Sequence, residues 1–312
     1  MRTRQEKVVI AGDGTRLYAR QTAGPKATGV PMICFNGIGV STIFWHHVEE
    51  RFSRERPVIC FDYRGHGESE FPRDLDGLTM EANADDGARV LDAFGHERAI
   101  LLGHSMGCQV IYTFAHRRPQ RTAMLVPMLG TYGHPVHTFL DTEVSALAAF
   151  VVGRRVGLVG ADLVTWVKAR LMGKDLTRRV MAWGARVAGI VDSRMPDADL
   201  HAYLNHMAVL SPVVFLRMAE HMAAHSAGPW LPSIAAPTLV VAGERDVFTP
   251  LWCSEQIARE LPCAKLFVLK GGSHAALVEQ PKAIEEALVA YLAEHDVDAR
   301  RAAPATPVTS AA

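Results

Sequence analysis

Residues 99–119 have the sequence AILLGHSMGCQVIYTFAHRRP, and this stretch decides the fold. Its apolar first residues predict a buried strand, and the apolar periodicity of residues 106–117 predicts a helix. The two meet at the pentapeptide G-H-S-M-G, with Ser105 at its centre. A serine on so sharp a turn needs a strained backbone, and glycines two positions to either side let the strand and the helix approach. Because the turn lifts its Oγ clear of the sheet, Ser105 is the candidate nucleophile.

Strand-like and helix-like segments alternate on both sides of this turn. Apolar runs predict strands at residues 8–11, 17–21, 31–35, 57–61, 99–103, 123–128, 238–242 and 265–269. Helices are expected at residues 42–52, 80–94, 106–117, 254–261 and 283–294. The first two strands, joined by a glycine-rich turn, predict an antiparallel hairpin at one edge. The alternation predicts an α/β fold with a mostly parallel eight-stranded sheet flanked by helices.

The alternation stops over residues 133–231, where only helical patterns rich in Ala, Val, Leu, Met and Arg occur. We expect a helical lid inserted after the sixth strand, because ligands in such sheets bind at the carboxyl ends of the strands. A helical decoration that only stabilises the fold is the alternative. The insertion divides the core into residues 1–132 and 232–295. Residues 296–312 carry no periodicity and predict a disordered tail.

A serine hydroxyl is a weak nucleophile near neutral pH, so it needs a base and an orienting acid. Asp246 follows the predicted seventh strand, and His274 follows the eighth. Because the carboxyl ends of parallel strands meet at one edge of a sheet, we expect Ser105, Asp246 and His274 to converge there. Glu244 is the competing acid. Asp246 is preferred because it lies further into the loop and its shorter side chain suits a fixed position.

Two backbone amides are candidates for the donors that stabilise a tetrahedral oxyanion. One belongs to Met106, at the start of the helix after the nucleophile. The other belongs to Ile38, in a loop after the third strand where two glycines let the backbone turn inward. The candidate substrate-pocket residues that flank these positions are Asn36, Gly37, Trp45 and His104.

The composition excludes several classes of partner. Lys plus Arg and Asp plus Glu both number 33, so the net charge gives no reason to expect a nucleic acid or an anionic membrane. Five cysteines without a C-x-x-C pair predict reduced thiols in a cytoplasmic protein. No secretory signal is expected, and the most apolar stretch, residues 144–161, is interrupted by Arg154 and Arg155, so no membrane span is expected. The expected partner is a small acyl substrate, and the oligomeric state stays open.

Neither a metal nor a cofactor is expected. His221 and His225 have a spacing that can bind a metal on a helix, but the sequence places no third ligand near them. The adjacent His46 and His47 predict a partly exposed pair.

Taken together, these motifs resemble the α/β-hydrolase family over nearly the whole chain. Residues 62–69, DYRGHGES, are similar to the family's D-x-R-G-x-G-x-S turn, and Trp45 follows the oxyanion loop as in many members. Asn36-Gly37 departs from the His-Gly that the family often carries there. The resemblance implies a hydrolase of the carboxylesterase or lipase type. A serine at the nucleophile position distinguishes the chain from haloalkane dehalogenases and epoxide hydrolases, which use aspartate.

The leading hypothesis is a serine hydrolase that cleaves a carboxylic ester through an acyl-serine intermediate. The apolar composition of the expected lid favours a lipid-like or aromatic acyl group. Hydrolysis of a carbon–carbon bond in a ring-cleavage dienoate is the alternative, together with acyl transfer and perhydrolysis. A non-catalytic ligand receptor on the same fold is disfavoured by the complete Ser–Asp–His set.

Overall fold

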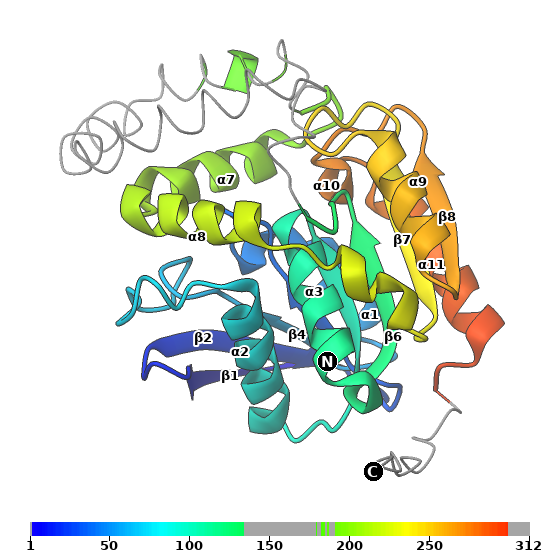
Figure 1. Cartoon of the computed structure of the whole chain (residues 1–312), viewed down its shortest axis with the longest axis horizontal. Helices are drawn as coiled ribbons and strands as arrows, with labels where there is room; N and C mark the ends of the chain where they lie inside the picture. Colours follow the sequence, from blue (N-terminus) through cyan, green and yellow to red (C-terminus); the bar gives the residue numbers. More distant parts are fainter. Residues whose placement is uncertain (1, 134–178, 180–181, 185, 187–190, 299–312) are drawn as a thin grey trace.

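The computed structural model describes residues 2–133, 179, 182–184, 186 and 191–298 (Figure 1). Eight strands form one sheet in the order β1-β2-β4-β3-β5-β6-β7-β8. Their bounds are β1 Thr3–Ile10, β2 Arg16–Ala23, β3 Met32–Phe35, β4 Val58–Phe61, β5 Ala99–His104, β6 Thr122–Met128, β7 Thr238–Gly243 and β8 Ala264–Leu269. The pairs β1–β2 and β2–β4 are antiparallel, and every other pair is parallel. The mostly parallel eight-stranded sheet predicted from the sequence is confirmed.

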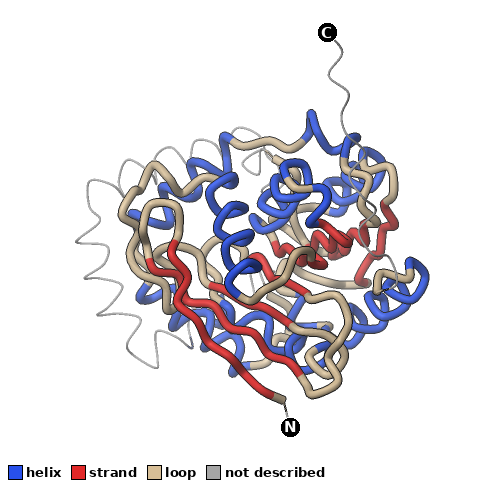
Figure 2. The backbone as a smooth tube through the Cα atoms, turned by 90° about the horizontal axis from the view of Figure 1, so that it is seen from below, coloured by secondary structure: helices blue, strands red, loops and turns tan. Residues whose placement is uncertain are grey.

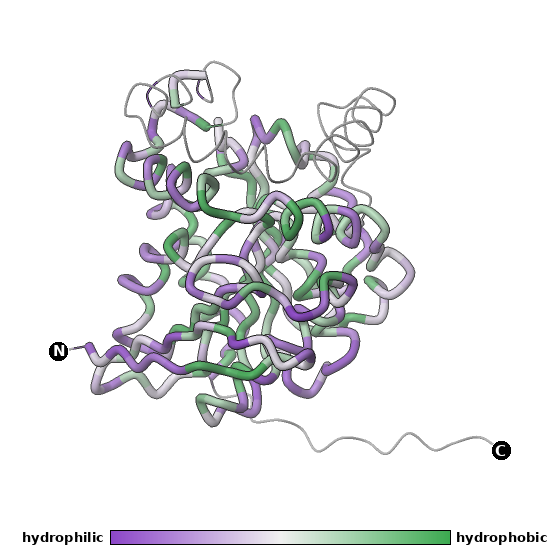
Figure 3. The backbone as a smooth tube through the Cα atoms, turned by 90° about the vertical axis from the view of Figure 1, so that its left-hand side faces the viewer, coloured by the Kyte–Doolittle hydropathy of each residue, from purple (hydrophilic) through white to green (hydrophobic). Residues whose placement is uncertain are grey.

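The hairpin of β1 and β2 lies at one edge of the sheet, as expected (Figure 2). β1 begins at Thr3, well before the apolar run at residues 8–11. Most of this strand is exposed, so its polar first half carries no hydrophobic signal, and its backbone pairing with β2 makes it a strand. The hydrophilic start of the chain is visible in Figure 3. Charged side chains suit an edge strand because they disfavour pairing with another sheet.

Helices cover both faces of the sheet. Their bounds are α1 His46–Phe52, α2 Met80–Ala93, α3 Met106–Arg117, α9 Leu251–Glu260, α10 Ala276–Glu279 and α11 Pro281–His295. The single helix expected over residues 42–52 is divided into a 3₁₀ turn, η1 (Thr42–Trp45), and α1. The four-residue helix α10 was not predicted, because one turn is too short to show a periodicity.

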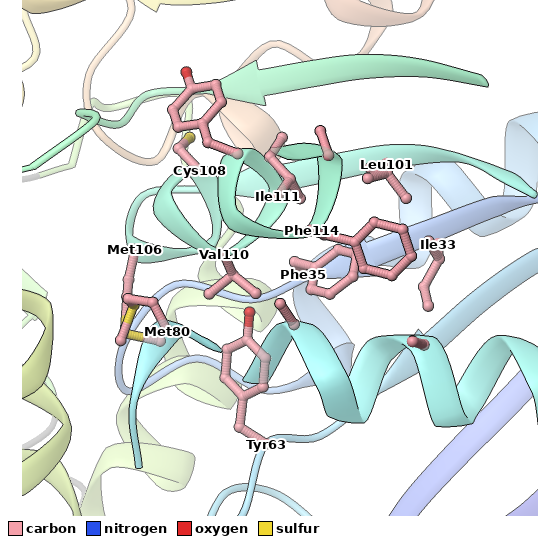
Figure 4. Packing of buried hydrophobic residues seen from close by; sticks show 14 of the residues in the cluster. Ile33, Phe35, Tyr63, Met80, Leu101, Met106, Cys108, Val110, Ile111 and Phe114 are labelled. Atoms are coloured by element: carbon pink, nitrogen blue, oxygen red, sulfur yellow. The ribbon is translucent and has the colours of Figure 1, made fainter. Parts of the chain in front are cut away.

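The core consists of two layers, one on each face of the sheet. Successive side chains of a strand point to opposite faces, so Leu101 of β5 packs with α2 and α3, whereas Ile100 packs with α1 and α11. Figure 4 shows the first layer, where the rings of Phe35 and Phe114 lie 6.1 Å apart. Because both faces are covered, the functional groups emerge at the ends of the strands.

Two described helices, α7 (Asp197–Val209) and α8 (Pro212–Ala224), lie in the segment between β6 and β7, followed by the 3₁₀ helix η5 (Gly228–Ser233). They lie together across one end of the sheet (Figure 1). Val214 and Met218 of α8 join one core layer, and Leu200 and Leu204 of α7 join the other. Most of the expected lid before α7 lies outside the described residues.

Within the described ranges, no single helix is long and apolar enough to cross a membrane. The pair α7 and α8 meets that criterion only jointly, by length and composition, and is bent by 100°.

The first three residues of the expected tail are attached to the core. Val297 is buried, and the carboxylate of Asp298 accepts hydrogen bonds from the Arg56 guanidinium, at 2.9 Å, and from the Val30 amide, at 2.8 Å. The rest of the expected tail, residues 299–312, lies outside the described residues.

Candidate active site

Ser105 sits on a strained turn between β5 and α3. Its φ of 54° and ψ of −118° lie in a region that non-glycine residues avoid. A Cβ on Gly103 would lie 2.6 Å from the carbonyl oxygen of Gly107, and a Cβ on Gly107 would collide with the backbone of Phe35. Both glycines are therefore needed for α3 to approach the sheet closely enough to form the turn.

The structure brings together the three side chains that the sequence placed at separate strand ends. Nε2 of His274 lies 3.0 Å from Oγ of Ser105. Nδ1 of His274 lies 2.8 Å from Oδ2 and 3.1 Å from Oδ1 of Asp246. If Nδ1–H donates to the carboxylate, Nε2 is left as an acceptor facing the hydroxyl, which is the arrangement that a general base requires.

Asp246 is fully enclosed. Burial disfavours its ionised form, but the facing His274 ring, together with hydrogen bonds from His274 and Thr249, holds the pKa of this carboxyl below its usual range. The Phe248 and Thr249 amides donate to Oδ1, and the Thr249 hydroxyl donates to Oδ2 at 2.7 Å. The carboxylate is therefore ionised and fixed at neutral pH. The competing acid, Glu244, is exposed and accepts instead from the Gly271 amide at 2.7 Å.

The loop that carries His274 is held by a second pair of residues. The Ser273 hydroxyl donates to the buried carboxylate of Glu279, at 2.7 Å and 2.8 Å, and accepts from the Ala275 amide at 3.1 Å. The same carboxylate accepts from the Asp192 amide at 2.6 Å. This support was not predictable from the sequence, because Glu279 belongs to the short helix α10.

His104, a candidate pocket residue, is buried and touches the loop of His274. Its Nε2 lies 3.0 Å from the carbonyl oxygen of His274. Burial and the nearby His274 ring lower the pKa of His104 to about 4, so the ring is neutral near pH 7 and Nε2–H is the donor. Phe44 packs beside this ring at 6.1 Å. His104 therefore contacts the backbone of the residue that faces Ser105.

The loop after β3 lies directly against the nucleophile. A Cβ on Gly37 would lie 3.1 Å from Cβ of Ser105 and 3.1 Å from Nδ1 of His104, so only glycine fits there without displacing its neighbours. The next residue is Ile38. Within the described part of the chain, the amides of Ile38 and Met106 donate no hydrogen bond to protein acceptors, which leaves both free for an oxyanion.

The turn at residues 62–69 fixes this loop from the other side. The Gly39 amide donates to Nε2 of His66 at 3.3 Å, and the Thr42 amide donates to Oδ1 of Asp62 at 2.8 Å. Burial lowers the pKa of His66 to about 4, which keeps Nε2 free to accept. The D-x-R-G-x-G-x-S motif was recognisable in the sequence, but no role followed from it there. In the structure it positions the candidate oxyanion loop.

Asn36 and Trp45, two further candidate pocket residues, are fully buried and bonded to each other. The Trp45 indole donates to Oδ1 of Asn36 at 2.7 Å, and Nδ2 of Asn36 donates to the Phe61 carbonyl at 2.9 Å. These bonds join the end of β3 to the end of β4. The asparagine that departs from the family pattern thus serves here to hold two strand ends together.

Apolar side chains from α7 and α8 approach the same loop. A Cβ on Gly39 would lie 2.7 Å from Sδ of Met207 and 3.3 Å from Cε2 of Phe215. On another side, Phe248 packs against the His274 ring at 4.9 Å. Apolar side chains therefore contact both the candidate oxyanion loop and the ring of the candidate base.

His225, one of the two histidines considered as metal ligands on one helix, follows the last residue of α8 in an extended conformation and has other partners. Its Nε2 lies 3.0 Å from Oγ1 of Thr113, and its ring packs against Trp230 at 5.5 Å.

A family model described as the alpha/beta hydrolase family matches residues 32–287. The chain belongs to the alpha/beta hydrolase family. Among curated proteins, this chain is 27% identical over 287 residues to a protein of Caulobacter vibrioides that bears the name "Putative carbamate hydrolase RutD". The match covers 88% of this chain and 95% of that protein.

Solved structures of other hydrolases share the fold. Est816, described as an N-acyl homoserine lactone degrading enzyme, is 25% identical, with a TM-score of 0.70 over 90% of this chain and 99% of that one. A hydrolase from Pseudomonas aeruginosa PA01 is 22% identical, with a TM-score of 0.74 over 92% of this chain and 98% of that one. The chain described here therefore shares its fold with both of these solved structures over nearly their whole length.

Proposed function

We propose that the protein is a serine hydrolase that cleaves carboxylic esters through an acyl intermediate on Ser105. The observation that carries the proposal is the continuous chain of contacts from Ser105 Oγ through His274 to Asp246. Such a chain activates a hydroxyl that is otherwise a poor nucleophile. A lone histidine near a serine would lack the fixed tautomer that the enclosed carboxylate of Asp246 provides.

In the first half of the reaction, Nε2 of His274 takes the Ser105 proton while Oγ attacks the ester carbonyl carbon. The amides of Ile38 and Met106 donate to the oxyanion that develops. Collapse of the tetrahedral intermediate expels the alcohol, which receives the proton from His274. In the second half, His274 takes a proton from water as the water oxygen attacks the acyl carbon. The bond between that carbon and Oγ then breaks, Oγ recovers the proton from His274, and the acid is released.

The substrate class follows from the surroundings of the nucleophile. Phe248 packs against the His274 ring, and Met207 and Phe215 lie beside Gly39 of the candidate oxyanion loop. Ile38 packs against the same core layer as Met207 and Phe215. An aliphatic or aromatic acyl group suits such a site, because apolar contacts contribute binding energy roughly in proportion to the area removed from water. We propose that α7 and α8 belong to a lid that lines the acyl side of the site.

The test is turnover of p-nitrophenyl acetate, butyrate and octanoate by the full chain and by Ser105→Ala. The variant should lose about 10⁵- to 10⁶-fold in kcat, as expected when the nucleophile of such a triad is removed. A fluorophosphonate probe should label the wild-type chain and leave Ser105→Ala unlabelled. Undiminished turnover in the variant contradicts the proposal, and a wild-type chain that neither reacts with the probe nor turns over esters is a receptor.

The comparisons favour a second candidate, hydrolysis of a carbamate or of a lactone. RutD at 27% identity and Est816 at 25% support it. The same groups serve both bonds. A lactone is a cyclic ester, and a carbamate carbonyl forms a similar oxyanion, from which the departing alcohol or amine takes its proton from His274. Esters, lactones and carbamates whose substituents have matched carbon counts separate the candidates by kcat/KM, because the preferred class of carbonyl substrate gives the highest value.

A further inference from the structure

A second group of polar side chains lies outside the triad, where α7 contacts the core. His46 and His47 occupy the first turn of α1, and Asp199 lies in the first turn of α7. One ligand atom from each residue lies within 4.8 Å of the other two. The reaction proposed above uses none of these three side chains.

His46 is oriented as a metal-binding histidine usually is. Its Nδ1 lies 3.0 Å from the Ile43 carbonyl oxygen, and its Nε2 lies 3.6 Å from Oδ1 of Asp199. A histidine ligand commonly donates one ring N–H to a carbonyl, which fixes the tautomer and directs the other nitrogen to the ion. With Nδ1–H donating to the Ile43 carbonyl, Nε2 of His46 presents its lone pair toward the carboxylate.

His47 supplies a buried nitrogen that lacks a partner. Its Nε2 has no hydrogen-bond partner in the described part of the chain. Consecutive side chains on a helix diverge by about 100°, yet the two imidazole rings lie 3.9 Å apart. An unpartnered buried nitrogen is costly in free energy, and a bound cation would satisfy it.

We propose that His46, His47 and Asp199 bind a zinc ion that fastens α7 to α1. A tetrahedral ion with bonds of about 2.0–2.1 Å holds its ligands about 3.4 Å apart. The His46–Asp199 distance of 3.6 Å already matches this spacing. Two imidazoles and one carboxylate favour zinc over Mg²⁺ or Ca²⁺, which prefer oxygen ligands. The fourth position belongs to water.

The location of the ion would connect the packing of α7 to the candidate active site. Phe44, in the turn immediately before α1, packs against Tyr203 of α7 at 5.8 Å and against His104 at 6.1 Å. An ion held by α1 and α7 would keep these contacts in place and would oppose the departure of α7 from the core. The sequence predicted only a partly exposed histidine pair here, because Asp199 lies far along the chain.

The test is zinc titration of the untagged full chain by calorimetry, after EDTA treatment, in a Cys263→Ser background that removes the exposed thiol. One equivalent should bind and raise Tm by about 5 °C or more at a hundredfold excess over Kd. His46→Ala and Asp199→Asn should each weaken binding at least about tenfold, since even the loss of an outer partner costs that much. His201→Ala, an exposed position on the same helix, is the matched control and should bind as the parent does. Mg²⁺ should leave Tm unchanged.

The proposal is overturned if micromolar zinc fails to bind the parent chain. It is equally overturned if Asp199→Asn and His46→Ala bind zinc with unchanged affinity, which would assign the ion to another place such as His274 and Asp246. Unchanged circular dichroism of Asp199→Asn, which keeps the size of the side chain, separates a lost ligand from a misfolded helix. None of these outcomes depends on ester turnover, so the experiment tests the zinc site independently of the proposed function.

Discussion

Nε2 of His104 lies 3.0 Å from the carbonyl oxygen of His274, so the residue before the candidate nucleophile holds the backbone of the candidate base. Replacing His104 with Phe keeps a ring of similar size but removes the donor. We expect kcat to fall about 10- to 100-fold with little change in KM, because a small misplacement of a catalytic group has an effect of this size. The unpaired carbonyl should also cost about 1–3 kcal/mol of unfolding free energy. His116→Phe, on the exposed end of α3, is the control and should leave both quantities unchanged.

The positive φ of Ser105 predicts an unusual ranking of two inactive variants. Glycine tolerates this backbone conformation and alanine does not, so Ser105→Gly should be more stable than Ser105→Ala by about 1 kcal/mol. At a position with an ordinary negative φ, the glycine variant of a protein is less stable than the alanine variant. Thermal unfolding of both variants measures the difference. A higher Tm for Ser105→Ala would argue against strain at this turn.

Asp246→Asn should reduce kcat about 10⁴-fold, because an asparagine stabilises the wrong tautomer of His274. It should also change the acid stability. The folded-state pKa of Asp246 is depressed below 3.8, so the ionised carboxylate stabilises the fold above that pH and loses its contribution as the pH falls through the folded value. The difference in unfolding free energy between the wild type and the variant should therefore shrink in acid. Denaturant unfolding at several pH values measures it. Glu244→Gln, at the exposed rival acid, should retain near wild-type activity.

Asp62 predicts the opposite pH dependence. Burial raises its pKa to about 6, although hydrogen bonds from the Thr42 and Glu68 amides favour the ionised form. The folded state then holds a proton that the unfolded state has lost, so this group's contribution to stability falls as the pH rises from about 4 to about 6, by as much as about 3 kcal/mol. In Asp62→Asn this dependence should vanish. Urea unfolding of both proteins between pH 4 and pH 7 tests it, and a constant difference across that range would refute the shifted pKa.

Much of the fold could be predicted, because buried parallel strands are short apolar runs that stand out from the helices between them. The convergence of Ser105, Asp246 and His274 was predictable for the same reason: each follows a strand whose carboxyl end lies at the same edge. The polar half of β1 and the single turn of α10 were not predictable, since neither carries a hydrophobic period.

The supporting contacts of the site could not be derived from the sequence. Each of them, such as His66 with Gly39, joins residues that are distant in the chain and becomes visible only when the loops are folded together. The motif at residues 62–69 was the available signal, yet it identified only the turn and not its partner. The proximity of His46, His47 and Asp199 was not predictable from the sequence for the same reason.

The space around Gly103 and Gly107 leaves no room for even one additional methyl group. Substitutions are therefore not tolerated at the two glycines of the bend that presents the nucleophile. Met207 and Phe215 belong to α7 and α8, which lie outside the sheet, so substitutions there leave the bend unchanged. Descendants of this chain that acquire new substrates should accumulate their changes in α7 and α8, and laboratory libraries aimed at altered selectivity should be directed to the same two helices.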